Sequence, residues 1–187
     1  MIGWIILGIA VVAVFYVVGI YNGLVQGRMQ VREGWSGIDV QLKRRHDLIP
    51  NLVETVKGYM GHEKGVLEEV ARLRSQATGA TALKERAALE NNITRAIGAI
   101  FAIVENYPDL KANQSFLDLQ KSLSGVEEEI QLARRYYNGT VRDYNIQVQS
   151  FPSNLIANAF HFETQEFFEI ETASERQAPA VKFDSTS

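Results

Sequence analysis

The sequence predicts an all-α protein in which an N-terminal transmembrane helix is followed by an up-and-down four-helix bundle with long helices. The first observation is an uncharged, apolar run from Ile2 to Ile20. The second is that apolar residues after this run recur at alternating spacings of three and four, the period of a buried helical stripe. The third is that only 4 prolines interrupt the 187 residues. Long helices with short connections pack as antiparallel neighbours.

The N-terminal run is predicted to be a single uncleaved membrane anchor. A helix needs about 20 apolar residues to cross about 30 Å of hydrocarbon, and the run from Ile2 to Ile20 matches that length. A secretory signal would have a basic start, a shorter apolar centre and small residues at a cleavage site. This run has an uncharged start and is followed by Tyr21 and Asn22, so it does not match that pattern.

The charges around the run predict its orientation. Nothing charged precedes it except the chain amine, whereas basic residues outnumber acidic ones after it. The positive-inside rule then places the body in the cytoplasm and a short N-terminus outside. The absence of cysteine fits a reducing compartment without excluding others. The charged residues after the run are Arg28, Arg32, Lys43, Arg44 and Arg45, against Glu33 and Asp39.

A first helical segment is expected over residues 31–73, and one proline leaves its interpretation open. Pro50 removes a backbone hydrogen bond and clashes with the carbonyl four residues earlier, yet the stripe keeps its phase across it. Either one kinked helix continues, or a turn lets Asp47 cap a new helix. Arg45 and Glu63 fall on the stripe, and a buried Glu63 would need an Arg or Tyr partner from another helix. The apolar stripe is formed by Val31, Trp35, Ile38, Leu42, Ile49, Leu52, Val56, Tyr59, Val66, Val70 and Leu73.

Two further helical segments are expected. The second covers about residues 82–107, after a short loop over 78–81, and Pro108 ends it because the residue before a proline disfavours the helical region. The third covers about residues 114–149, which at 1.5 Å per residue is roughly 50 Å of helix. Pro152 stops it.

The segment after Pro152 is rich in phenylalanine and too apolar to remain in water. It is expected to pack on the bundle, on a neighbouring subunit or on the membrane surface. From about Ala173 the periodicity ends and the composition changes to Ala, Ser, Thr, Pro and charge, which is typical of a disordered tail. The predicted organisation is an anchor over residues 1–27, a helical domain over 28–172 and a tail over 173–187.

The composition and motifs predict a protein without catalysis, cofactor or metal. A net charge of -3 argues against nucleic-acid binding, which needs a concentrated excess of Lys and Arg. His62-Glu63 begins a zinc-protease pattern, but position 66 is a valine where that pattern needs a second histidine. With 3 histidines and 0 cysteines the chain has few metal ligands. No phosphate-binding, dinucleotide-binding or serine-nucleophile motif occurs.

Glycines at regular spacing suggest self-association. Gly19, Gly23 and Gly27 stand at i, i+4 and i+8 where the chain leaves the membrane, and such small residues let helix backbones approach closely. Chance occurrence in a glycine-rich span is the alternative. Each glycine in a helix interior costs up to about 1 kcal/mol relative to alanine, so further glycines suggest close packing, including packing between subunits. These further glycines are Gly34, Gly37, Gly58, Gly61, Gly65 and Gly98.

Polar residues in two kinds of pattern are candidates for partner binding or structure. The basic cluster at residues 43–45 begins about 16 residues past Gly27, about 24 Å along a straight helix, so pairing within or between bundles is expected rather than lipid contact. Tyr-Asn pairs at 137 and 144 repeat after one heptad, which predicts core packing of both tyrosines with a buried hydroxyl bond. The candidate residues are Lys43, Arg44, Arg45, Asp47, Asp109, Lys111, Asn113, Tyr137, Asn138, Tyr144 and Asn145.

Several sequence blocks point to a known family. They are Tyr21–Val25, Ile38–Val53, Tyr107–Asn113, Arg134–Asn138, Tyr144-Asn145 and Phe151-Pro152. These blocks resemble the LemA family over nearly the whole chain up to Glu169. The resemblance implies a bacterial inner-membrane protein with one N-terminal span, a small external N-terminus and a cytoplasmic up-and-down bundle. It implies no reaction. Some members of the family are associated with membrane-protein quality control through a neighbouring membrane metalloprotease, which makes such a protease a possible partner.

Three functions remain open on the sequence alone. The first is a membrane-anchored scaffold that contacts lipid and forms homo-oligomers through its glycine stripe and helical faces. The second is a monomeric adaptor or sensor whose polar face recruits a membrane protease or another envelope quality-control partner. The third is a hydrolase that uses carboxylates such as those of Glu63 and Asp47. The first is the leading hypothesis, because long heptad runs and an apolar C-terminal segment favour association between copies.

Overall fold

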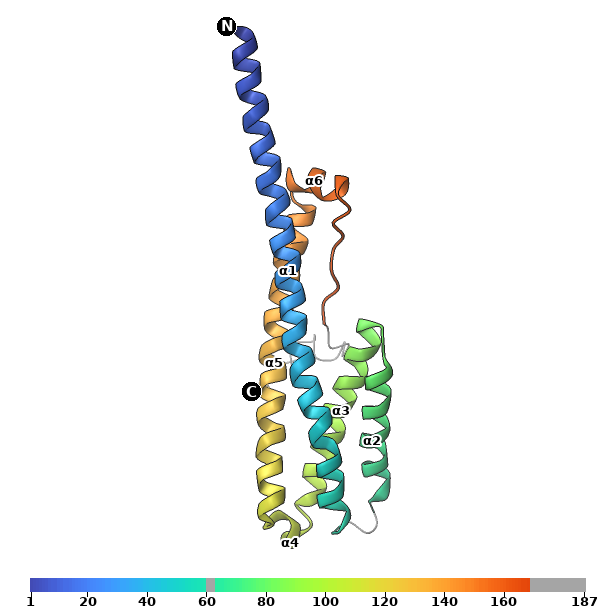
Figure 1. Cartoon of the computed structure of the whole chain (residues 1–187). Coiled ribbons are helices and arrows are strands. Elements are labelled where there is room, and N and C mark those ends of the chain that lie inside the picture. The colour runs from blue at the N-terminus through green and yellow to red at the C-terminus, as the bar shows by residue number, and fades with distance from the viewer. Residues whose placement is uncertain (60–62, 169–187) are drawn as a thin grey trace, which may run out of the picture.

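The computed structural model describes residues 1–59 and 63–168, and in this part of the chain it contains helices and no strands. The prediction of an all-α protein with a long apolar N-terminal helix and packed long helices is confirmed (Figure 1). The tail predicted over residues 173–187 lies outside the described residues. The helices are α1 (Ile2–Lys57), α2 (Lys64–Gly79), α3 (Leu83–Val104), α4 (Pro108–Lys111), α5 (Gln114–Gln149) and α6 (Ser153–Ala159).

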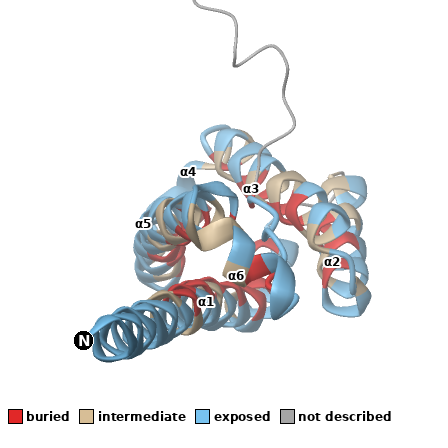
Figure 2. Ribbon diagram, turned by 90° about the horizontal axis from the view of Figure 1, so that it is seen from above, coloured by how far each residue is buried: buried red, intermediate tan, exposed pale blue. Residues whose placement is uncertain are grey.

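The first part of α1 projects alone from the bundle. Residues 2–19 are all exposed, as Figure 2 shows for the helix seen from its N-terminal end. This helix is long and apolar enough to cross a membrane, and its apolar window has no buried residue. Such a helix suggests a membrane anchor, because its side chains have no protein to pack against. α3 is also long and apolar enough to span a membrane, but it is shorter and less apolar than α1 and 39% of its apolar window is buried in the protein.

α1 continues through Pro50 without a break, which resolves the choice that the sequence left open. A proline at this position leaves the carbonyl of His46, four residues earlier, without its helical N–H donor. Arg74 of α2 replaces that donor, since its Nε donates to the His46 carbonyl oxygen at 2.7 Å. A side chain of the neighbouring helix α2 therefore supplies the hydrogen bond that the proline removes from α1.

The first predicted segment is divided between two helices, and the break follows Lys57 and not the Asp47–Pro50 region. α1 ends at Lys57 and α2 begins at Lys64, so the stripe is divided near Tyr59, which is exposed. The other two predicted segments correspond closely to α3 and α5, with the short helix α4 between them. The spacing of apolar residues shows which face of a helix is buried, but it does not show where the chain reverses direction. The continuous stripe therefore did not reveal the end of α1.

Two hydrophobic cores lie one after the other along the molecule. The distal core, farther from the apolar run, is enclosed by α1, α2, α3 and α5, with α4 at its end. Its central residues are Ile49, Leu52, Val56, Val70, Ile93, Ile97, Ile100, Leu110, Phe116 and Leu123.

The proximal core, nearer the apolar run, is built mainly from α1 and α5 and closed by the chain after α5. That chain forms α6 and then an irregular segment, residues 160–168, here called the strap, which runs back along the bundle (Figure 1). The central residues are Leu24, Val31, Ile38, Leu42, Val126, Ile130, Tyr137, Val141, Tyr144, Ala157, Phe162 and Phe168.

Candidate functional site

A buried polar layer lies between the two cores. Arg45 of α1 is 1% exposed and forms ion pairs with Glu90 of α3 and with Glu127 of α5, the latter at 2.5 Å. It also donates to the hydroxyl of Thr94 at 2.7 Å. His46 Nε2 lies 3.0 Å from a carboxylate oxygen of Glu90. One guanidinium thereby links three helices.

The environment keeps Glu90 ionised. Burial by itself would raise the pKa of this carboxyl, but the hydrogen bond with His46 and the positive charge of Arg45 outweigh burial and lower the pKa below its ordinary value. Glu90 is 2% exposed, so a substrate cannot reach it. A buried, multiply paired charge selects one register of the helices, because other registers leave it unpaired.

Sequence reasoning placed Arg45 on its stripe but missed its acidic partners. Glu90 stands three residues before Ile93 and seven before Ile97, so it occupies a stripe position of the second predicted segment. An acidic residue on one stripe and a basic residue on another form a detectable signal for a buried pair. Glu127 gives a weaker signal because it lies beside its stripe.

The two asparagines of the Tyr-Asn repeat hold the strap by its backbone. Asn145 accepts a hydrogen bond from the N–H of Gln165 at 2.8 Å and donates to the carbonyl of the same residue at 2.9 Å. Asn138 does the same with Phe168, at 2.9 Å and 3.2 Å. Each side-chain amide therefore pairs with one strap residue as a neighbouring β-strand would. We call this arrangement the asparagine clasp.

The heptad spacing of the repeat fits an extended chain. Seven residues of helix rise about 10.5 Å, and three residues of extended chain span about 10 Å, so positions seven apart on α5 match positions three apart on the strap. Tyr137 adds a hydrogen bond from its hydroxyl to the carbonyl of Glu166 at 2.9 Å. The predicted buried hydroxyl bond is thus present at Tyr137. The Tyr144 hydroxyl has no hydrogen-bond partner within the described residues.

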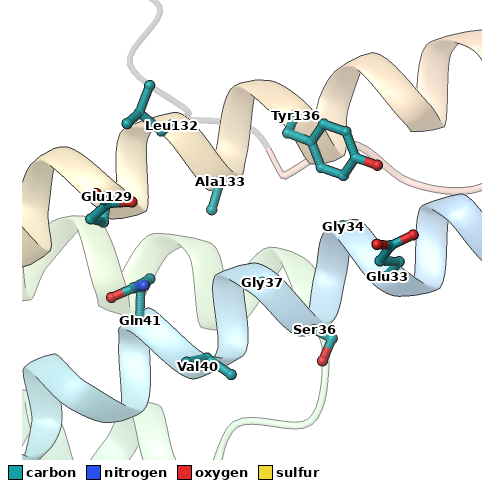
Figure 3. Close-up of a pocket in the computed structure, with 10 residues that line it drawn as sticks. All are labelled: Glu33, Gly34, Ser36, Gly37, Val40, Gln41, Glu129, Leu132, Ala133 and Tyr136. Atoms are coloured by element: carbon teal, nitrogen blue, oxygen red, sulfur yellow. The ribbon is translucent and has the colours of Figure 1, made fainter.

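A groove of about 590 Å³ runs along the outer side of α1 and α5, away from the strap (Figure 3). Its α1 side includes the small residues Gly34, Ser36 and Gly37, and its α5 side includes the exposed bulky residues Leu132 and Tyr136. The lining residues are Glu33, Gly34, Ser36, Gly37, Val40, Gln41, Glu129, Leu132, Ala133 and Tyr136.

Two glycines of this groove have different surroundings. A Cβ on Gly34 would lie 3.1 Å from the Tyr137 Cα, so Gly34 is required for the close approach of α1 to α5. A Cβ on Gly37 would meet nothing within 4 Å, so that position opens into the groove. Val40, Leu132 and Tyr136 are exposed around it. The groove therefore offers both a hollow and bulky apolar side chains to another molecule.

The structure separates the three glycines predicted to associate. Gly27 packs inside the chain, where an added Cβ would lie 3.0 Å from Gln147 Oε1 and 3.1 Å from Tyr144 Cδ2. An added Cβ would meet nothing within 4 Å at Gly19, which is exposed on the projecting part of α1, or at Gly23, which is half-buried. Of the further glycines, only Gly34 has such a close neighbour among those described, and Gly61 lies outside the described residues. The open ones are Gly37, Gly58, Gly65 and Gly98.

The predicted polar candidates occupy four separate places. Arg45 is buried in the polar layer, whereas its neighbours Lys43 and Arg44, and also Asp47, are exposed on α1. Tyr137, Asn138, Tyr144 and Asn145 lie at the proximal core and the clasp. The remaining candidates lie at the distal end, where Asn113 caps α5 by accepting from Phe116 N–H at 3.1 Å, Lys111 pairs with Glu105, and Asp109 is exposed in α4.

The two carboxylates of the hydrolase hypothesis, those of Asp47 and Glu63, lie in different environments. Asp47 is exposed. Glu63 interacts with Tyr107, whose pKa is raised by that hydrogen bond, by burial and by the negative charge of Glu63. Among residues 1–59 and 63–168, no group of three His, Asp or Glu side chains could hold a metal ion.

Comparison with known proteins identifies the family. A family model described as the LemA family matches residues 34–183, which is most of the chain. The chain belongs to the LemA family. The LemA match covers the polar layer, the asparagine clasp and almost all of the groove, and it begins after the apolar run.

Three curated relatives are similar over most of this LemA chain. Protein LemA of Metamycoplasma hominis is 28% identical over 152 residues, which cover 80% of this chain and 69% of the relative. Magnetosome protein MamQ 2 of Paramagnetospirillum magneticum is 23% identical, with coverages of 83% and 66%. Magnetosome protein MamQ of Magnetospirillum gryphiswaldense is 21% identical, with coverages of 79% and 64%. The similarity thus spans about two thirds of each relative's length.

Proposed function

We propose that this protein is a single-span membrane scaffold that assembles with copies of itself. The observation that carries the proposal is the continuity of α1, which runs from the apolar part through the proximal core and into the distal core. Because the helix is continuous, the tilt of the span fixes the tilt of the bundle relative to the membrane. Copies in one membrane then present the same face at the same height, which favours association through one repeated patch.

The α1–α5 groove has the shape that such an association needs. Gly37 leaves a hollow, and Leu132 and Tyr136 present exposed bulky side chains across from it. Around a two-fold axis along the membrane normal, the bulky side of one copy meets the hollow of the other. Small residues allow the backbones to approach, and a shared membrane raises the effective concentration of the copies.

The test is to fill the hollow without disturbing the chain itself. Gly37→Leu places a side chain in the groove, and Gly98→Leu places the same side chain on the exposed face of α3, where an added Cβ also meets nothing within 4 Å. Native mass spectrometry of complexes extracted from membranes is expected to show oligomers for the wild type and for Gly98→Leu, and monomers for Gly37→Leu. A wild-type protein that is monomeric over a wide concentration range would overturn the proposal.

A second candidate function is an adaptor that recruits a membrane protease or another quality-control partner. The observation that favours it is that Lys43 and Arg44 are exposed on α1 and form no ion pair within the described part of the chain. Two unpaired cations attract an acidic partner surface. Charge reversal at both positions is expected to remove copurifying membrane proteins. Recovery of the protein alone, with and without this change, would exclude the adaptor.

We further propose that the bundle lies in the cytoplasm of a bacterial cell, with a short N-terminus outside. The basis is the excess of Arg and Lys after the apolar run. The chain has 0 cysteines, so a single cysteine at exposed Leu117 can report the side of the membrane. An impermeant maleimide is expected to label Leu117→Cys only after the inner membrane is opened. Labelling in intact spheroplasts would place the bundle outside.

A further inference from the structure

The end of the bundle next to the apolar run carries exposed aromatic and aliphatic side chains. Phe151, in the turn before α6, is 79% exposed, Leu155 of α6 is 57% exposed, and Phe160 at its end is 55% exposed. Ala157 of α6 is fully buried in the proximal core. The three exposed side chains therefore lie on a segment that is packed against the bundle. We refer to Phe151, Leu155 and Phe160 as the apolar tip.

The apolar tip lies at the height where the apolar run ends. The Phe160 ring packs edge-on against the Tyr21 ring, with centroids 4.9 Å apart, and Phe162 packs against the same ring at 5.6 Å. Tyr21 directly follows the apolar run. Tyrosine at the end of a span favours the membrane–water interface, so a side chain in contact with it lies at the same depth.

Charge is absent from both chain segments that meet at this height. α1 has no Asp, Glu, Lys or Arg before Arg28, and residues 144–162, which include the end of α5 and all of α6, have none either. The charged groups begin at the edge of this zone, where Arg28 lies over the Phe162 ring at 4.9 Å and Arg142 pairs with Asp143 at 2.9 Å. Uncharged polar and aromatic groups suit the interfacial layer of a bilayer.

We propose that the apolar tip inserts into the interfacial layer of the bilayer that α1 crosses. This inference rests on the proposed membrane anchoring. It adds a second lipid contact beside the span, formed by Phe151, Leu155 and Phe160. Two contact points fix the rotation of the bundle about the span, which one helix alone leaves free. The orientation of the α1–α5 groove relative to the membrane is then the same in every copy.

The test uses the full chain in lipid vesicles with one fluorescent reporter at a time. Because the chain has 0 cysteines, Leu155→Cys, Val12→Cys and Leu117→Cys each give a single attachment point for an environment-sensitive dye. Val12 lies in the apolar run, and Leu117 is an exposed leucine at the distal end of α5. Lipids that carry a nitroxide near the headgroup quench dyes at the interface, where position 155 is expected, and lipids that carry one deep in the acyl chain quench a dye at position 12, in the middle of the span. Circular dichroism checks that each variant keeps its helices.

The expected result is quenching at positions 12 and 155 and little at 117, with position 155 quenched at least about twofold more than 117. Phe151→Asp is expected to reduce quenching at position 155, because it places a charge in the tip. Equal quenching at 155 and 117, with position 12 still quenched, would overturn this inference and leave the anchor intact. Absence of quenching at position 12 would instead overturn the anchor. Disulfide formation between Leu155→Cys copies without quenching would assign the tip to a second copy and overturn the inference.

Discussion

The distal and proximal halves of the bundle bury similar apolar stripes by different means. In the distal half, α1, α2, α3 and α5 enclose the core on all sides. In the proximal half, α1 and α5 provide most of the walls, and α6 with the strap closes the remaining side. A helix satisfies its own backbone hydrogen bonds, whereas a single extended segment does not. An irregular wall therefore needs side chains, here those of the asparagine clasp, in place of backbone hydrogen-bond partners.

This difference has a consequence for local stability. The distal half loses its core only if whole helices separate, and the polar layer at Arg45 joins three of them. The strap is held by a few hydrogen bonds and by buried Phe162 and Phe168, so it can open without the helices unfolding.

Removal of the central charge should affect the whole bundle. Arg45→Met leaves Glu90 buried without its main partner, which is expected to cost about 3–5 kcal/mol of unfolding free energy. Urea unfolding in detergent, followed by circular dichroism, measures it. Adding Glu90→Leu to the same chain should restore part of the loss, because the unpaired charge is then gone. A single variant within about 1 kcal/mol of wild type would mean that the layer is only a solvated contact.

The close approach of α1 and α5 should depend on one glycine. Gly34→Ala brings a Cβ to 3.1 Å from the backbone of Tyr137. Overpacking of this kind costs about 1–3 kcal/mol. The matched control is Gly37→Ala, which meets nothing within 4 Å and should be neutral or stabilising by about 1 kcal/mol because alanine favours the helix. Thermal unfolding compares them, and equal effects would contradict the prediction.

The hydrogen bond from Arg74 to the His46 carbonyl should matter only while Pro50 is present. Arg74→Met leaves the carbonyl of His46 without its donor and is expected to cost about 1–2 kcal/mol. In a chain that also carries Pro50→Ala, the backbone N–H at position 50 returns and the same change at Arg74 should cost much less. A double-mutant cycle measures the coupling. Strictly additive effects would show that the bond is not needed.

Loss of the asparagine clasp should open the proximal half only. Asn138→Leu or Asn145→Leu removes two hydrogen bonds to the strap and should cost about 1–2 kcal/mol locally. Hydrogen exchange should accelerate at Gln165 and Phe168 while protection around Ile97 in the distal core stays unchanged. The control, Asn92→Leu on α3, should leave the strap protected. Faster exchange in both halves would contradict the proposed independence.

Acid should weaken the polar layer through Glu90. The folded-state pKa of Glu90 is lowered from its ordinary value of 4.5, so its stabilising contribution is fully present above that value. It is lost as the pH falls through the lower folded-state pKa. The unfolding free energy of Glu90→Gln should therefore fall less steeply below that pH than that of wild type, and Glu128→Gln, at an exposed position on α5, serves as the control. Parallel curves for wild type and Glu90→Gln would contradict it.

Much of the fold follows from local patterns, and much of the candidate site does not. The apolar run and the stripes of α3 and α5 report burial directly, so the helices could be predicted from spacing. The groove could not, because Gly37 on α1 and Tyr136 on α5 carry no mark that they lie side by side. The sequence singled out Asn138 and Asn145 by their repeat, yet their role depends on a strap that approaches from outside the repeat.

The apolar helix, the helical class and the family blocks can be read from the sequence alone, because each depends on neighbours within a few residues along the chain. Three features became known only from the fold. α1 passes through Pro50 without a break, and Arg45 forms ion pairs with Glu90 and Glu127. Gly27 packs closely against α5 side chains, whereas the space beside Gly37 is empty. Those outcomes depend on which helix faces lie together and on how far apart their backbones rest. Such distances arise from the packing of the whole chain and not from any one stretch of it.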